Sequence, residues 1–462
     1  MGNPSTSRFW GLTFHVQTFG CQMNKHDSER VAGMLEALGA QSVATIEEAD
    51  IVVFMTCCVR EAADVRLMGQ VASMKNIPQR GESPLSKRIV AIGGCIGQRD
   101  GEKLLVQLPH VDVVFGTNNL ASLPGLIDAV LDGKERIAET LEESDGFPTD
   151  LPTVREQSWA AWLPITIGCN NFCTYCIVPY VRGREKSRPF DEIVAEAQRY
   201  VASGVKEITL LGQNVNSYGR DLYGEPRFAE ILHAVADTGI ERLRFATSHP
   251  KDLTDAVIEA FGTVDNIMPA LHLPAQHGSD RILKAMHRSY TSSHYLELVS
   301  KLRDACPGIA LSTDIIVGFP GETEEDFQCT YNLVKEVGYS QVFTFIYSKR
   351  EGTPAAKIED NTPREVIQER FDRLRTVVEQ GAYDFNQVQA GKTVPVLFEG
   401  FSKKDGNVVT GRSPENITVH APLPGGWSAD GVIGSTLPVK IDEARTWYLR
   451  GTLMAGESAR GN

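Results

Sequence analysis

Between residues 163 and 388 the sequence alternates six times between a short apolar segment and a helical one. The apolar segments are residues 163–168, 207–212, 243–247, 270–274, 310–317 and 341–347, and the last helical segment spans residues 364–388. Such alternation predicts parallel strands, each joined to the next by a helix on the face of the sheet. Six units are too few for a closed eight-stranded barrel, so we expect an open, partial (β/α)6 barrel within residues 155–390.

An α/β pattern also precedes this region. Four further apolar segments have the character of buried strands: residues 14–18, 51–56, 89–92 and 111–115. Helical segments lie between them, for example residues 28–38 and 60–73, so residues 10–140 are predicted to form a parallel sheet covered on both faces. Residues 139–160 have little periodicity and are expected to form a linker.

From residue 391 onward the hydrophobic period changes to two. Five short segments are separated by Gly, Pro, Asn and Asp turns: residues 393–398, 407–410, 417–420, 432–441 and 447–452. This pattern predicts a small five-stranded, OB-like β-barrel within residues 391–455, followed by a frayed tail.

Small barrels of this kind bind nucleic acid through exposed strands and loops. The basic candidates to face phosphates are Lys392, Lys403, Lys404 and Arg412. Three aromatic residues, Phe398, Phe401 and Trp447, either stack on bases or fill the barrel core, and we expect the core for most of them.

The composition is that of an ordinary globular protein, with 42% hydrophobic and 23% charged residues. No apolar run approaches the roughly 18 to 20 residues that cross a bilayer, and the first eight residues lack the apolar core of a signal peptide. We therefore expect a cytoplasmic protein with no membrane partner, whose nine cysteines are thiols or metal ligands. The formal charge of −13 argues against a general nucleic-acid coat.

Three cysteines follow residue 168 with C-x3-C-x2-C spacing: Cys169, Cys173 and Cys176. Three thiolates on one loop can hold three irons of a 4Fe-4S cluster and leave the fourth iron open. The alternatives are a zinc site, which would need a fourth ligand, and a disulfide, which is disfavoured in a cytoplasmic chain. The spacing resembles the radical S-adenosylmethionine (radical SAM) signature. In that signature SAM binds the open iron and is split to a 5′-deoxyadenosyl radical, so these cysteines are both catalytic and metal-binding.

Cys21, Cys57 and Cys95 each lie just past the C-terminal end of a predicted parallel strand. Loops at that edge of an open α/β sheet converge on one crevice, so three thiolates are expected to meet there and to hold a second 4Fe-4S cluster. The alternative is three buried core cysteines. Cys58 is expected to point away from Cys57 if the strand continues, and it is not counted as a ligand.

A basic run lies directly after the cysteine loop and contains Arg182, Arg184, Lys186 and Arg188. A run of charges is usually a solvated face. Its position beside a redox cluster favours binding of an anionic substrate instead.

Several motifs resemble those of the methylthiotransferase family of radical SAM enzymes. They are Thr-Phe-Gly-Cys-Gln-Met-Asn at residues 18–24, Thr-Cys-Cys-Val-Arg-Glu at 56–61, Gly-Cys at 94–95 with Gln98, and residues 168–188. The likeness covers the whole chain, and the C-terminal barrel resembles a TRAM domain. Met55 and Gly97 depart from the family pattern, which more often has Asn and Ala there.

The resemblance implies a chemistry and a set of partners. Within the family, the Gln-Met after Cys21 is most similar to members that add a methylthio group to carbon 2 of an isopentenylated adenosine at tRNA position 37. The implied cofactors are two 4Fe-4S clusters and SAM, which supplies the methyl group and the radical. The implied partners are the tRNA anticodon loop and an electron donor such as flavodoxin or ferredoxin.

Contacts to SAM are expected at the C-terminal ends of the barrel strands. The candidates that follow strands are Gln213, Asn214, Ser248 and Gln276, with His249, His277 and Arg281 nearby, and Asp314 is a candidate within the fifth strand. An ordinary polar cap on a strand end is an equally good interpretation of each residue taken alone.

Two other functions remain open. One is a sister methylthiotransferase acting on threonylcarbamoyl-adenosine in tRNA or on an aspartate of a ribosomal protein. The other is a non-catalytic iron–sulfur protein that binds RNA, although a purely structural cluster would prefer four protein ligands.

Overall fold

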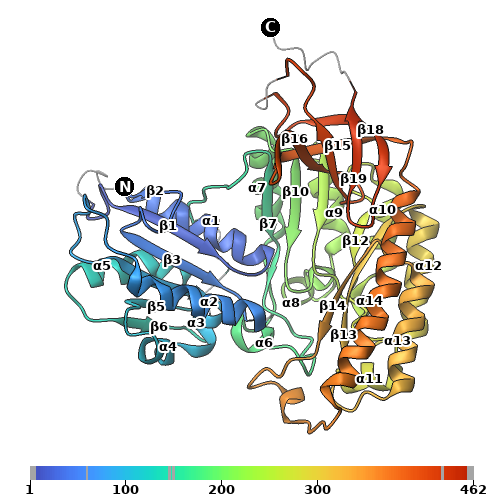
Figure 1. Ribbon diagram of the computed structural model, residues 1–462, viewed down its shortest axis with the longest axis horizontal. Coiled ribbons are helices and arrows are strands. Elements are labelled where there is room, and N and C mark those ends of the chain that lie inside the picture. Colours follow the sequence, from blue (N-terminus) through green and yellow to red (C-terminus); the bar gives the residue numbers. More distant parts are fainter. Residues whose placement is uncertain (1–6, 59–60, 144–146, 148–150, 428–430, 455–462) are drawn as a thin grey trace. The chain divides into compact units, whose positions relative to one another are not determined.

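The computed structural model describes residues 7–58, 61–143, 147, 151–427 and 431–454 (Figure 1). It comprises two units. The first contains residues 1–156, 166–172 and 176–187, and the second contains residues 157–165, 173–175 and 188–462. None of the helices in the described part of the chain is long and apolar enough to cross a membrane.

A six-stranded parallel sheet forms the first unit, in the order β2-β1-β3-β4-β5-β6. Its strands are β1 (Thr13–Thr18), β2 (Gln41–Ser42), β3 (Ile51–Thr56), β4 (Ile89–Gly94), β5 (Val113–Phe115) and β6 (Ile137–Glu139). The helices around it are α1 (Gln22–Ala37), α2 (Glu61–Ser73), α3 (Cys95–Asp100), α4 (Glu102–Gln107) and α5 (Leu123–Leu131). Every residue of β3 and β4 is buried, because apolar clusters cover both faces of the sheet. The predicted parallel α/β sheet is confirmed.

The sequence placed some boundaries of this unit wrongly. Helix α1 begins at Gln22 and not at residue 28, because its first turn follows Cys21 directly and is polar. The edge strands β2 and β6 have two and three residues, too few to show a period. Residue 60, the predicted start of α2, lies outside the described residues. The tail predicted at residues 451–462 is wrong at its start, because residues 451–453 belong to the last strand, and its part from residue 455 lies outside the described residues. The predicted linker is not free of structure, since the Val154 N–H donates to the Glu29 carbonyl at 3.0 Å.

The second unit contains the six predicted parallel strands, in two adjacent sheets with the orders β11-β10-β7 and β12-β13-β14. They are β7 (Ala160–Pro164), β10 (Glu207–Leu211), β11 (Arg242–Phe245), β12 (Ala270–His272), β13 (Ala310–Val317) and β14 (Gln341–Ile346). The larger helices are α7 (Phe190–Ala202), α9 (Phe228–Ala236), α10 (Asp255–Thr263), α11 (Asp280–Ala285), α12 (Ser292–Ala305), α13 (Glu324–Val337) and α14 (Arg364–Gln387). One apolar core joins strands and helices, and the open, partial (β/α)6 barrel is confirmed.

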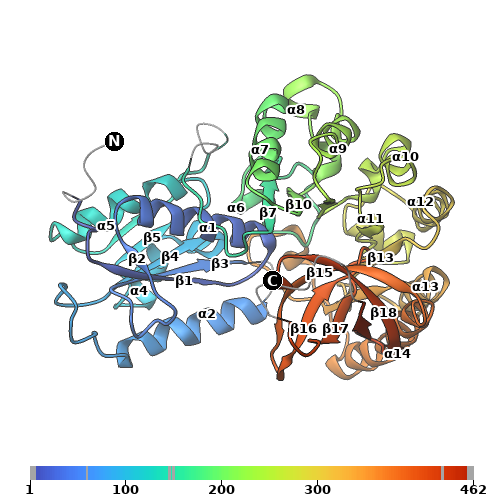
Figure 2. The same ribbon diagram turned by 90° about the horizontal axis from the view of Figure 1, so that it is seen from above.

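The chain ends in a closed barrel of five strands, seen from above in Figure 2. They are β15 (Thr393–Ser402), β16 (Asp405–Arg412), β17 (Thr418–Pro422), β18 (Thr436–Ala444) and β19 (Leu449–Leu453). Phe398 is fully buried in the barrel core, whereas Phe401 and Trp447 are 43% and 51% exposed. The expectation that most of the three aromatic residues fill the core is therefore wrong, since two of them face solvent.

A buried ionic group attaches this barrel to the rest of the second unit. Arg242 and Arg244, on β11, both reach the carboxylate of Glu207, at 3.0 and 2.8 Å. Their remaining guanidinium nitrogens donate to the backbone carbonyls of Arg412, Ser413 and Pro414 at 2.9–3.1 Å. Glu207 and Arg242 are the first residues of their strands, so the barrel is held at the N-terminal ends of β10 and β11.

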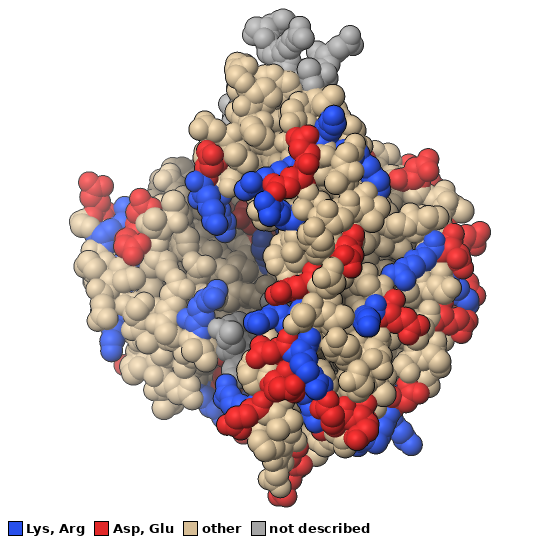
Figure 3. All heavy atoms as spheres, turned by 45° about the vertical axis from the view of Figure 1, so that its right-hand side comes forward, with Lys and Arg blue, Asp and Glu red and all other residues tan. Residues whose placement is uncertain are grey.

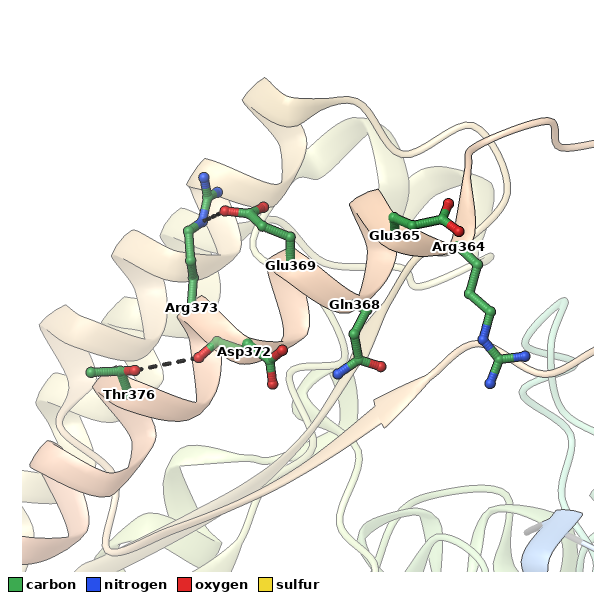
Figure 4. A pocket seen from close by; sticks show the side chains of 7 residues that line it. All are labelled: Arg364, Glu365, Gln368, Glu369, Asp372, Arg373 and Thr376. Atoms are coloured by element: carbon green, nitrogen blue, oxygen red, sulfur yellow. Dashed lines mark hydrogen bonds and ion pairs between the residues drawn. The ribbon is translucent and has the colours of Figure 1, made fainter.

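The outer helices α13 and α14 carry mixed charges (Figure 3). Arg370 and Arg373 of α14 both pair with Glu324 of α13. A surface hollow on α14 is lined by seven polar side chains of that helix: Arg364, Glu365, Gln368, Glu369, Asp372, Arg373 and Thr376 (Figure 4). Acidic and basic side chains alternate along it, as on an ordinary solvated helix face, and it is not a candidate site.

Candidate cluster and cofactor site

The register of the first sheet brings three cysteines to one edge. Thr18 pairs with Met55 and Thr56 pairs with Gly94, so the three chain segments leave the sheet at the same level. Cys21 begins the approach to α1, Cys57 follows β3, and Cys95 follows β4. The thiols of Cys21 and Cys57 are hydrogen-bonded to each other. The sheet thus places Cys21, Cys57 and Cys95 together at its C-terminal edge.

A glycine makes this close approach possible. Gly20 has a φ of +117°, and a Cβ atom there would lie 2.2 Å from the Cβ of Cys57. Any larger residue would push the Cys21 segment away from β3. The departure from the family pattern at Gly97 has a similar cause, because a Cβ there would lie 2.2 Å from the Phe115 carbonyl oxygen.

Cys58 does not point away from this group, and that expectation is wrong. Strand β3 ends at Thr56, so the alternation of side chains stops one residue before Cys57. Cys58 is fully buried and its thiol is hydrogen-bonded to Cys95. The hydrogen bond to Cys95 and, to a smaller extent, burial raise the pKa of Cys58, so this thiol favours its protonated form.

A buried guanidinium lies beside these thiols. Arg182 is 8% exposed and its Nη2 lies 3.0 Å from both the Asn24 Oδ1 and the Asp27 carboxylate. A hydrogen bond from Cys57 lowers the pKa of Cys21, one from Cys58 lowers the pKa of Cys95, and the Arg182 charge adds to both effects. The site therefore favours thiolates, which are the form that binds iron.

The basic run is not a free cationic surface. Arg182 is bound in the first unit as described, and Arg188 is 1% exposed and pairs with Glu192 and Glu196 of α7. Arg184 is exposed and lies over the Phe172 ring at 4.5 Å. The expectation of an anion-binding patch is wrong for the two buried arginines.

The loop with Cys169, Cys173 and Cys176 is closed by a short antiparallel ladder of β8 (Thr166–Ile167) and β9 (Lys186–Ser187). At Gly168, φ is +75°, and a Cβ would lie 2.1 Å from the Arg184 carbonyl oxygen. Cys169 and Cys173 are buried and Cys176 is partly buried. Within the described ranges no three His, Cys, Asp or Glu side chains form a finished metal-binding group, so the assignment of ligands rests on the placement of the thiols.

Buried polar atoms without partners gather past the C-terminal ends of β10 and β11. Among the residues that the structure describes, they include Gln213 Oε1, Asn214 Oδ1, Ser248 Oγ and both side-chain polar atoms of Asn216. Each would cost roughly 1–3 kcal/mol if left unpaired, so this rim suits a polar ligand. Thr247 has a φ of +69°, a strained value for a β-branched residue of the kind that gathers at functional sites.

This rim, the set of residues that follow the C-terminal ends of the open-barrel strands, continues toward β12 and β13. The Val215 N–H donates to the Thr247 carbonyl, and the His249 ring lies 5.7 Å from that of Tyr290, which donates to the Ala275 carbonyl. Gln276, also with a positive φ of 65°, bridges to β13 next to Asp314. Burial lowers the pKa of His249 to about 2, helped by Arg288 and Lys251, so this imidazole is neutral.

Other strand-end candidates have structural partners. The carboxylate of Asp314 lies 3.4 Å from His272, and Asn214 Nδ2 donates to Asp252 at 2.7 Å. His277 is held by Glu322 at 3.1 Å, and Arg281 pairs with Asp326. The last two side chains therefore stabilise the chain segment that follows β13.

Sequence reasoning missed Asn216 and Arg288. A second asparagine two residues after Asn214 was a visible signal for the first. Nothing in the sequence links Arg288 to Cys173, although its Nη1 lies 3.6 Å from that sulfur.

Three family models match the chain: the radical SAM superfamily at residues 163–334, the uncharacterized protein family UPF0004 at residues 13–116, and the TRAM domain at residues 387–454. Fold and cysteine placement together define a radical SAM protein with an N-terminal α/β sheet and a C-terminal TRAM barrel.

Curated relatives narrow this class. The tRNA-2-methylthio-N(6)-dimethylallyladenosine synthase of Thermoanaerobacter sp. (strain X514) is 45% identical over 96% of this chain and 93% of its own length. That of Acidothermus cellulolyticus is 48% identical over 88% and 82%, and that of Carboxydothermus hydrogenoformans is 44% identical over 96% and 99%. The chain belongs to the family of the tRNA-2-methylthio-N(6)-dimethylallyladenosine synthases.

Solved structures share the fold at low sequence identity. The radical SAM methyltransferase TsrM from Kitasatospora setae, with cobalamin and a 4Fe-4S cluster bound, has a TM-score of 0.54 at 13% identity over 75% of this chain and 77% of its own. The cobalamin-dependent radical SAM enzyme OxsB has a TM-score of 0.50 at 13% identity, covering 81% of this chain and 57% of its own.

Proposed function

We propose that this chain is a radical SAM methylthiotransferase. It adds a methylthio group to carbon 2 of N(6)-isopentenyladenosine at position 37 of tRNA. The observation that carries the proposal is its identity of 44–48% with relatives of that name over 88–96% of the chain. The carbon–hydrogen bond at that ring position has no acidic proton, so acid–base groups alone do not suffice.

Two sets of thiols would hold the two 4Fe-4S clusters. Cys169, Cys173 and Cys176 would hold the one that binds SAM, and Cys21, Cys57 and Cys95 would hold the other. When bound, the first supplies the electron that splits SAM, and the second supplies a site for the sulfur that is transferred. The donor set supports this assignment, because each set is rich in sulfur and has a buried guanidinium beside one of its thiols.

The rim of the open barrel would bind SAM. Gln213, Asn214, Asn216 and Ser248 have unpaired polar atoms that a ligand with amino, carboxylate and ribose groups would satisfy. Gln276, which follows β12, and Asp314, which lies within β13, would be further candidate contacts, and the Gln276 N–H donates to the Asp314 carbonyl. The neutral His249 offers a hydrogen bond without placing a second cation beside the sulfonium.

The partners follow from this chemistry. The tRNA would bind through its anticodon loop, with the TRAM barrel holding the phosphate backbone, and an electron donor such as flavodoxin or ferredoxin would reduce the cluster. A cytoplasmic location is part of this proposal, because a tRNA-modifying enzyme must meet its tRNA.

Nucleoside mass spectrometry of tRNA tests the reaction. A strain that lacks this protein should lose 2-methylthio-N(6)-isopentenyladenosine and accumulate the isopentenylated precursor, and the intact gene should restore the product. Loss of a methylthiolated threonylcarbamoyl-adenosine instead would identify the sister enzyme, and unchanged tRNA would contradict the proposal.

Iron content tests the assignment of ligands. Replacing Cys169, Cys173 and Cys176 with Ala should halve the iron after reconstitution and abolish cleavage of SAM. Replacing Cys21, Cys57 and Cys95 should also halve the iron but leave cleavage of SAM to 5′-deoxyadenosine. Replacing Cys306 and Cys329 is the matched control and should change neither value. Full iron in the second variant would show that the second cluster is absent.

A further inference from the structure

Arg288 is a buried charge on the rim of the second unit. It is 7% exposed, and its guanidinium is held from three directions. Nε donates to the Tyr290 hydroxyl at 2.9 Å, Nη2 donates to the Pro274 carbonyl at 2.7 Å, and Nη1 donates to the Cys173 sulfur at 3.6 Å. The Tyr290 hydroxyl in turn donates to the Ala275 carbonyl at 2.8 Å. The guanidinium is therefore fixed to the end of β12 and directed at one sulfur atom.

This cation has no carboxylate beside it. In the described part of the chain, the ionisable groups that act most strongly on Arg288 are Tyr290, Tyr175 and Cys173, and its charge also acts on the His249 imidazole. Burying an unpaired guanidinium is costly, and the Cys173 sulfur, 3.6 Å from Nη1, is the neighbour that carries negative charge when it ligates a cluster. The geometry thus suits a thiolate, or a cluster bound through it.

The segment that carries Cys173 is itself fixed against the second unit. The Thr174 N–H donates to the Met286 carbonyl at 3.0 Å, and its hydroxyl donates to the Ala285 carbonyl at 2.9 Å. The Ala355 N–H donates to the Thr174 carbonyl at 2.9 Å, and Tyr175 packs on an apolar cluster that includes Met286. Thr174, next to Cys173, is therefore bound to the turn after α11 that also carries Arg288. This shared attachment keeps the Nη1–H group of Arg288 close to the Cys173 sulfur.

We propose that Arg288 is a positioning residue that raises the reduction potential of the cluster held by Cys169, Cys173 and Cys176. A hydrogen bond to a ligand sulfur and a buried positive charge both stabilise the state with one more electron. The protein thereby makes the cluster easier to reduce before SAM is split. The inference rests on the proposed function, because it assumes that these three cysteines bind a cluster.

The experiment uses full-length protein in which Cys21, Cys57 and Cys95 are Ala, so that only one cluster contributes to the signal. The midpoint potential is measured by redox titration followed by electron paramagnetic resonance. Arg288→Gln should shift the potential to a more negative value, and Arg288→Lys, which keeps the charge, should return most of that shift. Arg370→Gln is the matched control, since Arg370 is 5% exposed and pairs with Glu322 and Glu324, and it should leave the potential unchanged.

An Arg288→Gln protein that binds its cluster at the parent potential would overturn the inference. If that variant fails to bind iron, Tyr290→Phe decides the matter, because without the hydroxyl that holds Nε the guanidinium is no longer fixed toward the Cys173 sulfur. A negative shift in Tyr290→Phe supports the inference and an unchanged potential refutes it. A parent protein that binds no 4Fe-4S cluster would instead refute the proposed function, so the two failures are distinguishable.

Discussion

Single buried side chains set much of the electrostatics of this molecule. Glu29 is 9% exposed, on the face of α1 that the chain around residue 155 covers. Its carboxylate accepts from the Glu156 N–H at 3.1 Å, but burial dominates and raises the pKa of Glu29 to about 7. Arg182 and Arg288 show the opposite case, in which neighbouring groups keep a buried charge in place.

Glu29 predicts a pH dependence of stability. Its pKa is higher in the folded state than the ordinary value near 4.5, so the folded state binds more protons between about pH 4.5 and 7. Its contribution is present below that range and is lost as the pH rises to 7, up to about 3 kcal/mol. Glu29→Gln should remove this loss and be more stable than the parent at pH 8.

Thermal unfolding of both proteins at pH 5.5 and pH 8 measures this effect. The control is Glu36→Gln, an exposed site on the same helix, which should follow the parent at both values. Parallel pH curves for Glu29→Gln and the parent would show that Glu29 is solvated in the folded protein.

At the residue scale, the sequence predicted the place of a side chain correctly where that side chain directly follows a predicted strand. Cys21, Cys57 and Cys95 came together because each follows a parallel strand, and that much was predictable. Cys58 was placed wrongly because the strand ended one residue before Cys57. Arg288 was not predictable, because its contact with Cys173 joins residues 115 positions apart.

At the scale of elements, apolar runs located most strands but missed β2 and β6 at the edges of the first sheet. The six strands of the open barrel were predicted from apolar runs that alternate with helical segments, and the five of the closed barrel from their period of two. The strands β2 and β6 were missed because their own residues show no strand pattern. They are strands because they pair with β1 and β5. The attachment of the closed barrel was also missed, because its acceptors are backbone carbonyls of residues 412–414.

That attachment predicts a large cost for Arg244→Met. The change would leave the Pro414 carbonyl without this donor and would weaken the pairing of Glu207 in a buried place, which should destabilise the second unit by about 3 kcal/mol. Denaturant unfolding measures the loss. Arg227→Met removes an exposed ion pair with Glu230 and should change stability little. Equal stability of both variants would mean that the barrel is held by other contacts.

At the scale of the whole molecule, the closed barrel exposes lysines although the chain as a whole is acidic. The chain carries a formal charge of −13, yet Lys392, Lys403 and Lys404 of the closed barrel are exposed. Arg412 is less available than expected, because it lies 3.7 Å from Glu399 and donates to the Asn416 carbonyl. The binding of a polyanion is therefore expected to depend on a few lysines and on the exposed rings of Phe401 and Trp447.

The salt dependence of tRNA binding tests this expectation. Each phosphate contact releases counterions, so replacing Lys403 and Lys404 with Glu should weaken binding and lower the slope of log affinity against log salt by about 1.5. Lys335→Glu, at an exposed position of α13, is the matched control and should keep the parent slope. An unchanged slope in the double variant would place the tRNA contacts elsewhere.

The attachment of the barrel also limits which substrates the protein can use. The loop at residues 412–414 is held at the starts of β10 and β11, whereas the unpaired polar groups of the rim follow the ends of the same strands. The five residues of β10 alone span about 16 Å. A molecule that contacts both the loop at residues 412–414 and these polar groups must be longer than one strand. The length of a molecule therefore decides whether it can make both contacts. We therefore expect a free nucleoside to contact one end only and a folded RNA arm to contact both.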